Sequence, residues 1–278
     1  FHGKATNKAI KKFKDKIDFI GFHGQTIYHN SDEKISKQLG SGKLLSKLTK
    51  KKVVYDFRQN DLKNGGQGAP LTPIFHKLLK KKFKIKDAIF LNIGGIVNIT
   101  AIWENDSMSG TDIGPGMCLI DRWLRKRIKK NYDENGIIAK SGKVNKKILD
   151  QLLENFYKKE ESQNKGLVKS FDIKYFDSSY VDNLSTEDGT STLTEFTAQV
   201  IIAALKKADL YKQKIILCGG GRKNNFLVEK LKEKINKIKL IDEYEVNGDF
   251  VESQAFAYLA IRSYLKLPIS FPETTGCL

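Results

Sequence analysis

Short apolar runs rich in β-branched residues alternate along the chain with longer segments of helical periodicity. The runs that predict strands cover residues 17–24, 52–58, 87–95, 96–103, 214–221 and 238–242. Apolar residues at helical spacing instead predict helices over 72–83, 147–159, 191–208 and 250–265. Because strands and helices alternate in this way, the pattern is typical of an α/β protein.

Local signals refine the ends of these elements. Asp249 is expected to cap the helix over 250–265, with Glu252 three residues on in a capping-box relation. Asn224 is the candidate cap of a helix that follows the strand at 214–221. The polar segment 158–190, rich in Lys, Asp and Ser, is expected to be an exposed excursion.

Length and composition describe an ordinary globular protein. A chain of 278 residues corresponds to one large domain or two of usual size. No apolar run approaches the roughly 18 to 20 residues that span a bilayer, and the N-terminus has no apolar core of a signal peptide, so we expect a cytoplasmic protein. The three cysteines, Cys118, Cys218 and Cys277, lack disulfide or zinc spacing and are expected to be buried or incidental thiols.

The formal net charge of +17 raises the question of a polyanionic partner. Lysines are spread over many segments, however, and no nucleic-acid module or interleaving of aromatic and basic residues accompanies them. A lysine-rich solvated surface is therefore the favoured interpretation, with no nucleic-acid and no membrane partner expected.

Two glycine elements follow predicted strands. Gly94 and Gly95 separate two apolar strands, where a type I′ or II′ hairpin turn requires glycine, although such a turn can also expose backbone N–H groups to phosphate oxygens. Gly219, Gly220 and Gly221 lie between a strand and a helix entrance, an arrangement that suits a nucleotide and also suits simple turn chemistry.

Between these elements lies "GTDIGPGMCLIDRW", in which Asp112 precedes Gly114, Pro115 and Gly116 and a run that reads as helix. An acid there can be a helix cap or an Asx-turn residue. It can also hold Mg²⁺ against a phosphate, or act as a general base. Phosphoryl transfer needs positioned phosphates, a metal and one placed base, so turn, acid and turn together favour a nucleotide-dependent enzyme.

The first quarter of the chain concentrates side chains with planar hydrogen-bonding groups. Each histidine alone is more often structural than catalytic. Together the groups resemble what a polyhydroxylated, amide-bearing or carboxylate-bearing ligand requires. They are His23, Gln25 and His29 after the first strand, and Asp56, Arg58, Asp61, Gln67 and His76 around a glycine turn.

Seven motifs resemble, in the same order, those of the anhydro-N-acetylmuramic acid kinases of bacterial cell-wall recycling, a family of the actin-like and sugar-kinase superfamily. The combination of "GGQGAPL", "NIGG" and "DIGPG" is specific to that family. The motifs are "GFHGQTIYH", "DFRQNDLKNGGQGAPLTPIFH", "FLNIGGIVNIT", "GTDIGPGMCLIDRW", "TSTLTEFTA", "CGGGRKNNFLVEKL" and "ESQAFAYLAIR" with a closing "ETTG".

The resemblance implies an α/β protein with the two-domain actin-like ATPase (ribonuclease H-like) fold and ATP in the interdomain cleft. Residues 1–86 would be the remnant of an incomplete first, sugar-side domain, to which 267–278 return. Residues 87–266 would form the second, nucleotide-side domain. A homodimer is left open.

The family opens the 1,6-anhydro ring of its sugar with water and transfers the γ-phosphate of ATP to O6, giving N-acetylmuramic acid 6-phosphate. By motif, Asp112 matches the base that activates water for attack at C1. The resemblance implies ATP and Mg²⁺ as cofactors, with the metal ligands unassigned. The matched nucleotide positions are Gly94, Gly95, Gly114, Gly219, Gly220, Gly221 and Asn224, and the candidate sugar positions are His23, Gln25, Asp56, Arg58 and Gln67.

The chain also departs from the family pattern. Ile113 and Met117 replace the usual Thr and Asn, and "VKSFDIKYF" (168–176) replaces a Pro-Lys-Ser-Thr-Gly-Arg-Glu type segment. Nothing in Phe1 to Asp18 resembles the family's first phosphate loop, so we expect residues 1–278 alone to be poorly soluble and nearly inactive. The alternative function is a non-catalytic nucleotide- or amino-sugar-binding protein derived from the kinase.

Overall fold

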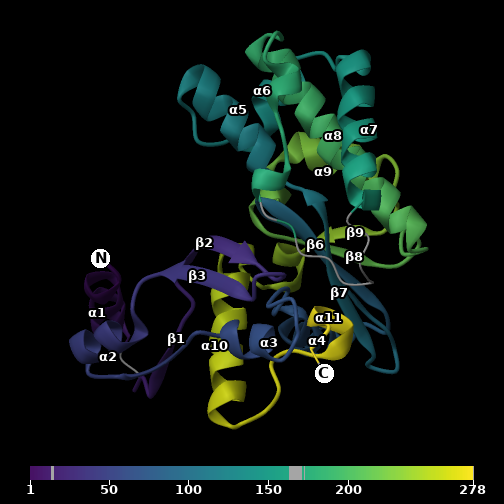
Figure 1. Cartoon of the computed structure of the whole chain (residues 1–278). Coiled ribbons are helices and arrows are strands. Elements are labelled where there is room, and N and C mark those ends of the chain that lie inside the picture. The colour runs from purple at the N-terminus through teal and green to yellow at the C-terminus, as the bar shows by residue number, and fades with distance from the viewer. Residues whose placement is uncertain (14–15, 163–170, 172, 278) are drawn as a thin grey trace. The chain divides into compact units, whose positions relative to one another are not determined.

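A computed structural model describes residues 1–13, 16–162, 171 and 173–277 (Figure 1). The fold is mixed α/β, and the chain divides into two compact units, Phe1–Phe75 with Glu252–Leu278, and His76–Val251. The sequence predicts boundaries at 86/87 and 266/267, and both lie further along the chain than the observed boundaries at 75/76 and 251/252. This division assigns most of α10 (Val251–Tyr264) to the first unit, whereas the sequence expectation assigned it to the second.

The second unit is built on a five-stranded sheet in the order β7-β6-β5-β8-β9. β6 pairs antiparallel with β5 and β7, while β8 pairs parallel with β5 and β9. Four of these strands confirm the expected apolar runs, and β7 was not expected. The strands are β5 (Ala88–Ile93), β6 (Ile96–Ile102), β7 (Met108–Pro115), β8 (Ile215–Cys218) and β9 (Ile238–Leu240).

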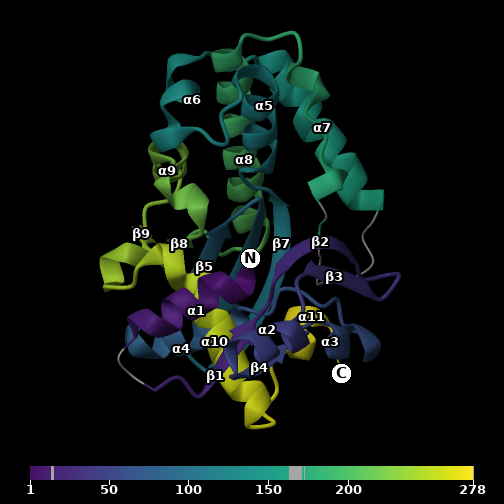
Figure 2. The same ribbon diagram turned by 90° about the vertical axis from the view of Figure 1, so that its left-hand side faces the viewer.

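Helices cover one face of this sheet (Figure 2). The central helix, α8, contacts α5, α6, α7 and α9. Trp123 of α5 is 1% exposed, and its indole Nε1 donates to the carbonyl of Thr186 at the start of α8 (3.1 Å). An aromatic side chain buried to this extent contributes about 3–5 kcal/mol to stability. The helices are α5 (Cys118–Ile128), α6 (Ile137–Ser141), α7 (Lys146–Ser162), α8 (Thr186–Lys207) and α9 (Asn225–Lys232).

The opposite face packs against α4 (Pro73–Lys82), of which His76 and the residues after it belong to the second unit. The His76 ring stacks on Phe90 at 4.6 Å between centroids, and its Nδ1 lies 2.9 Å from the Thr100 hydroxyl. Burial lowers the pKa of His76 to about 3, so the ring is neutral. His76 therefore has a structural role in the core.

The first unit contains two small sheets. β1 pairs parallel with β4, and β2 pairs antiparallel with β3. Gly21 of β1 lies against the backbone of α10, where a Cβ would come within 2.7 Å of the Phe256 carbonyl oxygen. The strands are β1 (Phe19–Phe22), β2 (Gln25–Asn30), β3 (Ile35–Leu39) and β4 (Lys52–Tyr55), and the helices besides α10 are α1 (His2–Lys12), α2 (Gly42–Thr49), α3 (Gln59–Lys63) and α11 (Pro272–Thr275).

Short 3₁₀ helices complete the described structure. They are η1 (Glu134–Gly136), η2 (Ile173–Tyr175), η3 (Ser179–Val181), η4 (Gly220–Lys223), η5 (Ile241–Tyr244) and η6 (Gly248–Phe250). Because η6 precedes α10, the expected capping role of Asp249 is wrong. Its carboxylate instead accepts from Arg222 Nη2 (2.9 Å) and Lys223 Nζ (2.6 Å).

The sequence predicts an exposed excursion over 158–190, and this prediction is wrong for the described part of the segment. α7 continues to Ser162 and α8 begins at Thr186, and Phe171, Phe176 and Val181 are buried in the core of the second unit. These apolar side chains are spaced among polar ones, and for this reason the segment reads as solvated from composition alone. Residues 163–170 and 172 lie outside the described residues.

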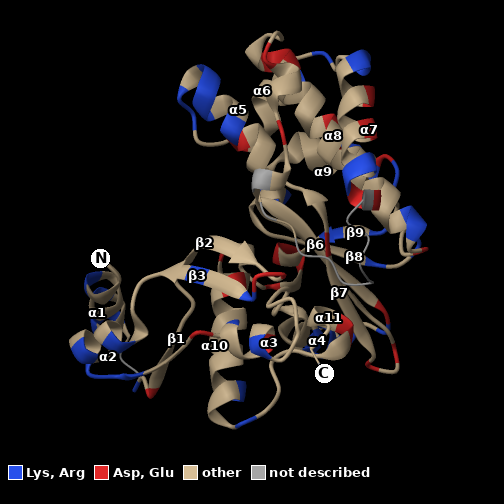
Figure 3. Cartoon of the chain, viewed as in Figure 1, with Lys and Arg blue, Asp and Glu red and all other residues tan. Residues whose placement is uncertain are grey.

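Within the described residues, no helix is long and apolar enough to cross a membrane. Lys and Arg residues occur on helices throughout the chain, including α1, α2, α5 and α7 (Figure 3). Several are paired with acids, as in the 2.7 Å contact of Lys126 with Asp182.

Candidate active site

Polar side chains line up across the second unit's sheet, near the carboxyl ends of β5 and β8. Asn92 of β5 is in register with Asn98 of β6, which in turn is in register with Asp112 of β7. Cys218, the last residue of β8, pairs with Asn92 on its other side. Because directly opposite residues share one face of a sheet, these four side chains form a row across it.

Asp112 lies within β7 rather than in a turn at a helix start, so of the alternatives that the sequence left open, the helix cap and the Asx-turn residue are excluded. Its side chain is 8% exposed, and Oδ2 accepts a hydrogen bond of 2.9 Å from the backbone N–H of Phe171. The Phe171 ring belongs to an aromatic cluster with Tyr175 and Phe176. The N–H donor is thus held by a packed side chain, and it fixes the orientation of the carboxylate.

The Gly94–Gly95 turn lies directly against the start of α5. The carbonyl of Gly95 accepts from the N–H groups of Gly116 (2.9 Å) and Cys118 (3.2 Å), and the carbonyl of Gly94 accepts from Met117 (2.9 Å). Neither glycine of the turn has a positive φ, so the expected type I′ or II′ geometry is wrong. A Cβ on Gly116 would overlap the Gly94 carbonyl, which explains glycine at that position by close packing.

The Gly94 N–H donates within the hairpin, to the carbonyl of Ile96 (3.2 Å). Gly114 likewise has a packing role, because a Cβ there would approach Val200 at 2.6 Å. The replacement residue Ile113 packs against the hydrophobic core, and Met117 is buried at the N-terminus of α5. Both apolar departures from the family pattern are therefore accommodated by the core.

The three glycines after β8 occupy different environments. Gly219 has a φ of +78° and lies against Asn92 and Ile93, while a Cβ on Gly221 would overlap the Ile93 side chain. At Gly220 a Cβ would meet no described atom within 4 Å. Backbone at Gly220 is therefore open to a ligand, at the same end of the sheet as Asp112.

Asn224 caps α9, as expected, because its Oδ1 accepts from the Leu227 N–H (3.0 Å). Its Nδ2 is buried and has no hydrogen-bond partner among the described residues. A buried donor of this kind costs about 1–3 kcal/mol when nothing satisfies it. An acceptor supplied from outside the described chain would remove that cost.

In the first unit, His23 and Arg58 are brought into direct contact. His23 Nε2 accepts from Arg58 Nε (3.0 Å), and His23 Nδ1 lies 2.8 Å from the Gly24 carbonyl. Nδ1 therefore carries the proton. Burial, with a smaller effect of the Arg58 charge, lowers the pKa of His23 to about 4, so the ring is neutral near pH 7.

Arg58 and the loop of Gln67 meet through Gly68, whose carbonyl accepts from Arg58 Nη1 (2.7 Å). The Gly68 N–H donates to Asp61 Oδ2 (2.6 Å), and Asp61 Oδ1 accepts from the Thr275 hydroxyl (2.7 Å). Gln67 itself donates from its backbone to the Thr275 carbonyl (2.7 Å). Sequence reasoning missed Thr275 as part of this network, although the closing "ETTG" motif was a signal for it.

The other two candidate sugar residues of the first unit are exposed. Gln25 begins β2, and its amide Nε2 lies at the limit of hydrogen bonding, 3.5 Å from the Thr26 carbonyl. Asp56 follows β4 with a φ of +63°. Neither shares in the hydrogen bonds, given above, that join His23, Arg58 and the Gln67 loop.

The thiols of the second unit are unreactive because they are buried. Burial raises the pKa of Cys118 to about 11 and that of Cys218 to about 12, so both thiols are neutral and poor nucleophiles. Among the described residues, no group of three His, Cys, Asp or Glu side chains could hold a metal ion. The second unit offers a buried acid on β7 and an open glycine loop after β8, at the same end of one sheet.

Comparison with known proteins gives extended matches in sequence. A family model described as anhydro-N-acetylmuramic acid kinase matches residues 4–278. The anhydro-N-acetylmuramic acid kinase of Pelagibacter ubique is 53% identical over 99% of this chain and 75% of its own length. Those of Methylobacterium nodulans and Zymomonas mobilis are each 40% identical, over 94% and 97% of this chain and 69% and 74% of their own.

Two solved structures show distant similarity. An activator of 2-hydroxyisocaproyl-CoA dehydratase from Clostridium difficile with bound ADPNP has a TM-score of 0.38 at 15% identity, over 66% of this chain and 63% of that one. The ethanolamine utilization protein EutJ from Carboxydothermus hydrogenoformans has a TM-score of 0.40 at 13% identity, over 77% and 58%. Both similarities are too distant to assign a family. The sequence matches assign it: the chain belongs to the anhydro-N-acetylmuramic acid kinase family.

Proposed function

We propose that this chain is an ATP-dependent kinase that opens 1,6-anhydro-N-acetylmuramic acid with water and phosphorylates O6. The product is N-acetylmuramic acid 6-phosphate, formed in the cytoplasm during peptidoglycan recycling. The observation that carries the proposal is the common position of a buried acid, Asp112, and the open glycine loop at Gly220, at one end of one sheet in a member of this family. Family membership favours this kinase over the non-catalytic alternative.

Asp112 is the proposed general base. The water oxygen bonds to C1 as the bond from C1 to O6 breaks, and Asp112 takes the water proton. O6 bonds to the γ-phosphorus of ATP as the bond from that phosphorus to the β-phosphate oxygen breaks, and ADP leaves. The Phe171 N–H supports this role because it orients the carboxylate. A correctly placed base contributes roughly 10²- to 10⁴-fold to the rate.

The nucleotide is proposed to bind along the Gly219–Gly221 loop, with the Gly94–Gly95 turn and Asn224 nearby. The open space at Gly220 and the unpartnered Asn224 Nδ2 fit this assignment. ATP is the phosphoryl donor, and Mg²⁺ bound with it would neutralise the charge of its phosphates. The protein ligands of the metal stay unassigned.

The two compact units are proposed to be the halves of an actin-like ATPase fold, with the first unit on the sugar side and the second on the nucleotide side. In the first unit the proposed sugar residues are Gln25, Asp56, and the connected group of His23, Arg58 and Gln67. The neutral ring of His23 supports the proposal, because it holds Arg58 without repelling the guanidinium.

The test is ADP formation by the protein with and without 1,6-anhydro-N-acetylmuramic acid, run in H₂¹⁸O. We expect ADP release that depends on the sugar, slow in residues 1–278 alone, and one ¹⁸O atom at C1 of the phosphorylated product with none in its phosphate. Nucleotide binding without sugar-dependent ADP release would instead support the non-catalytic alternative.

A further inference from the structure

A buried arginine follows the glycine loop directly and holds its backbone. Arg222 is 4% exposed, and its Nη1 donates to the carbonyl of Gly219 (2.9 Å). Gly219 is the loop residue with φ of +78°, and the peptide that follows it leads to the open position at Gly220. The guanidinium therefore restrains the orientation of the peptide that a ligand at Gly220 would meet.

Two acids fix the guanidinium in turn. Nε donates to Asp242 Oδ2 (2.6 Å), while Nη2 donates to Asp242 Oδ1 (3.2 Å) and to Asp249 Oδ1 (2.9 Å). The bond to Arg222 lowers the pKa of Asp242, while the bonds to Lys223 and then to Arg222 lower the pKa of Asp249, and desolvation opposes both shifts. Paired bonds of this kind are strong and geometrically specific.

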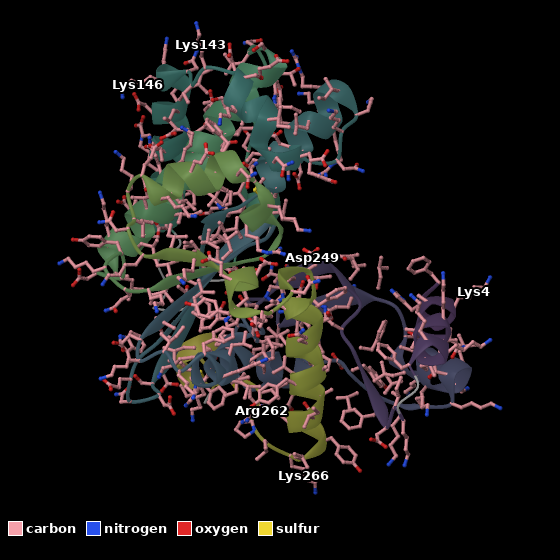
Figure 4. All side chains as sticks on the ribbon, turned by 180° about the vertical axis from the view of Figure 1, so that it is seen from behind. Lys4, Lys143, Lys146, Asp249, Arg262 and Lys266 are labelled. Carbon is pink, nitrogen blue, oxygen red and sulfur yellow. The ribbon has the colours of Figure 1, made fainter. Side chains whose placement is uncertain are left out.

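The surrounding backbone is shaped for this side chain. Gly248 lies against the guanidinium, where a Cβ would overlap it, and the Gly248 N–H donates to Asp242 Oδ1 (3.1 Å). Figure 4 labels Asp249, which lies two residues before α10 begins. Three separate segments, at Gly219, Asp242 and Asp249, thus converge on one arginine.

We propose that Arg222 is a positioning residue for nucleotide binding, which sets the conformation of the Gly219–Gly221 loop while Asp242 and Asp249 hold Arg222 in place. The proposal rests on the proposed function, in which this loop binds ATP. Lysine cannot replace arginine here, because its ammonium is a point charge without the planar fork that bonds the carbonyl and both acids together.

The test compares Arg222→Lys and Asp249→Asn with the control Lys223→Gln, all in the 278-residue chain. Lys223 also bonds Asp249, but its side chain is 58% exposed and makes a surface ion pair of little energetic weight. Calorimetry measures binding of β,γ-imido-ATP with Mg²⁺ and, separately, of 1,6-anhydro-N-acetylmuramic acid. Thermal unfolding of each variant is followed alongside.

We expect Arg222→Lys to weaken nucleotide binding about 10-fold and Asp249→Asn about 3-fold, as loss of hydrogen bonds to charged groups predicts. Lys223→Gln should stay within about twofold, and sugar affinity should stay within about twofold in all three. An equal loss of nucleotide and sugar affinity would overturn the proposal, as would unchanged nucleotide affinity in both Arg222→Lys and Asp249→Asn.

Gly220→Val separates failure of this inference from failure of the proposed function. If Gly220→Val loses nucleotide affinity while Arg222→Lys and Asp249→Asn retain it, the loop binds the nucleotide without help from Arg222, and only the inference is wrong. If Gly220→Val also binds the nucleotide normally, the loop is not the nucleotide site and the proposed nucleotide assignment is wrong. Should Arg222→Lys fail to fold, Asp249→Asn decides the question.

Discussion

His23 accepts a hydrogen bond of 3.0 Å from Arg58, and the two residues are 35 positions apart in the sequence. The ring also stacks on Phe256 of α10 at 4.2 Å between centroids. Because Arg58 is bonded to the Gly68 carbonyl as well, the imidazole and the glycine loop together fix the guanidinium. The contact links three segments of the first unit that the sequence suggested only as separate motifs.

Replacing His23 should therefore change sugar binding through Arg58. His23→Gln keeps an acceptor oxygen within reach of Arg58 Nε, whereas His23→Leu removes it. We expect the KM for the sugar to rise about 10-fold in His23→Leu and clearly less in His23→Gln, with the KM for ATP unchanged in both. Steady-state kinetics with each substrate varied in turn checks this, and equal effects of the two variants would argue against an acceptor role.

The same histidine should make stability depend on pH. Its pKa is about 4 in the folded protein and about 6.5 in the unfolded chain, so the unfolded chain binds more protons between these values. Stability is therefore complete above about pH 6.5 and falls as the pH drops toward 4, by about 2 kcal/mol for a partly solvated ring. Urea unfolding at pH 7 and pH 4 should show a smaller loss in His23→Gln, and an identical loss would mean that other groups dominate.

The same substitution at two neighbouring glycines should change the free energy of unfolding by different amounts. Gly220→Val adds a side chain into open space and should leave the free energy of unfolding within about 1 kcal/mol, while it weakens nucleotide binding. Gly221→Val would overlap Ile93 and should cost about 1–3 kcal/mol of stability. Urea unfolding and nucleotide titration of both variants test the difference, and similar stability losses would contradict the open environment of Gly220.

Asp112→Asn should separate catalysis from binding. An asparagine retains an oxygen that can accept from the Phe171 N–H but is not a base, so kcat should fall roughly 10²- to 10⁴-fold while nucleotide affinity is kept. Asp182→Asn, a surface change that also removes one negative charge, is the control and should leave kcat within about twofold. A normal kcat in Asp112→Asn would show that the acid has only a structural role.

The strands with continuous apolar runs could be predicted from the sequence, and β7 could not. Its residues alternate polar, glycine and apolar types over Met108–Pro115, and pairing with β6 makes them a strand. Local reasoning therefore placed Asp112 in a turn. Similarly, the sequence around Asp249 is typical of a helix N-cap, but its carboxylate instead accepts a hydrogen bond from the guanidinium of Arg222.

Prediction of the candidate site succeeded where a motif is local, and it failed where the bonded residues are far apart in the sequence. The open glycine at Gly220 and the Asn224 cap follow from a strand–turn–helix pattern. The donor to Asp112 is the backbone of Phe171, 59 residues away, in a segment that composition describes as exposed. A backbone donor has no side-chain signature, so only the folded chain reveals it.

Asp61 and Thr275 are the most widely separated side-chain pair of the site, 214 residues apart and both buried. Thr275→Val keeps the shape of the side chain but removes the hydroxyl that donates to Asp61 Oδ1. Because a buried carboxylate then loses a donor, we expect a loss of about 1–3 kcal/mol in the free energy of unfolding. The bonds of Gly68 and Gln67 to the same two residues should loosen too, so sugar affinity should fall while nucleotide affinity does not.

Thr275→Ser retains the hydroxyl and is the matched control. Urea unfolding and titration with both ligands decide the matter, and a serine variant as impaired as the valine variant would show that the methyl group, rather than the hydrogen bond to Asp61, holds this loop.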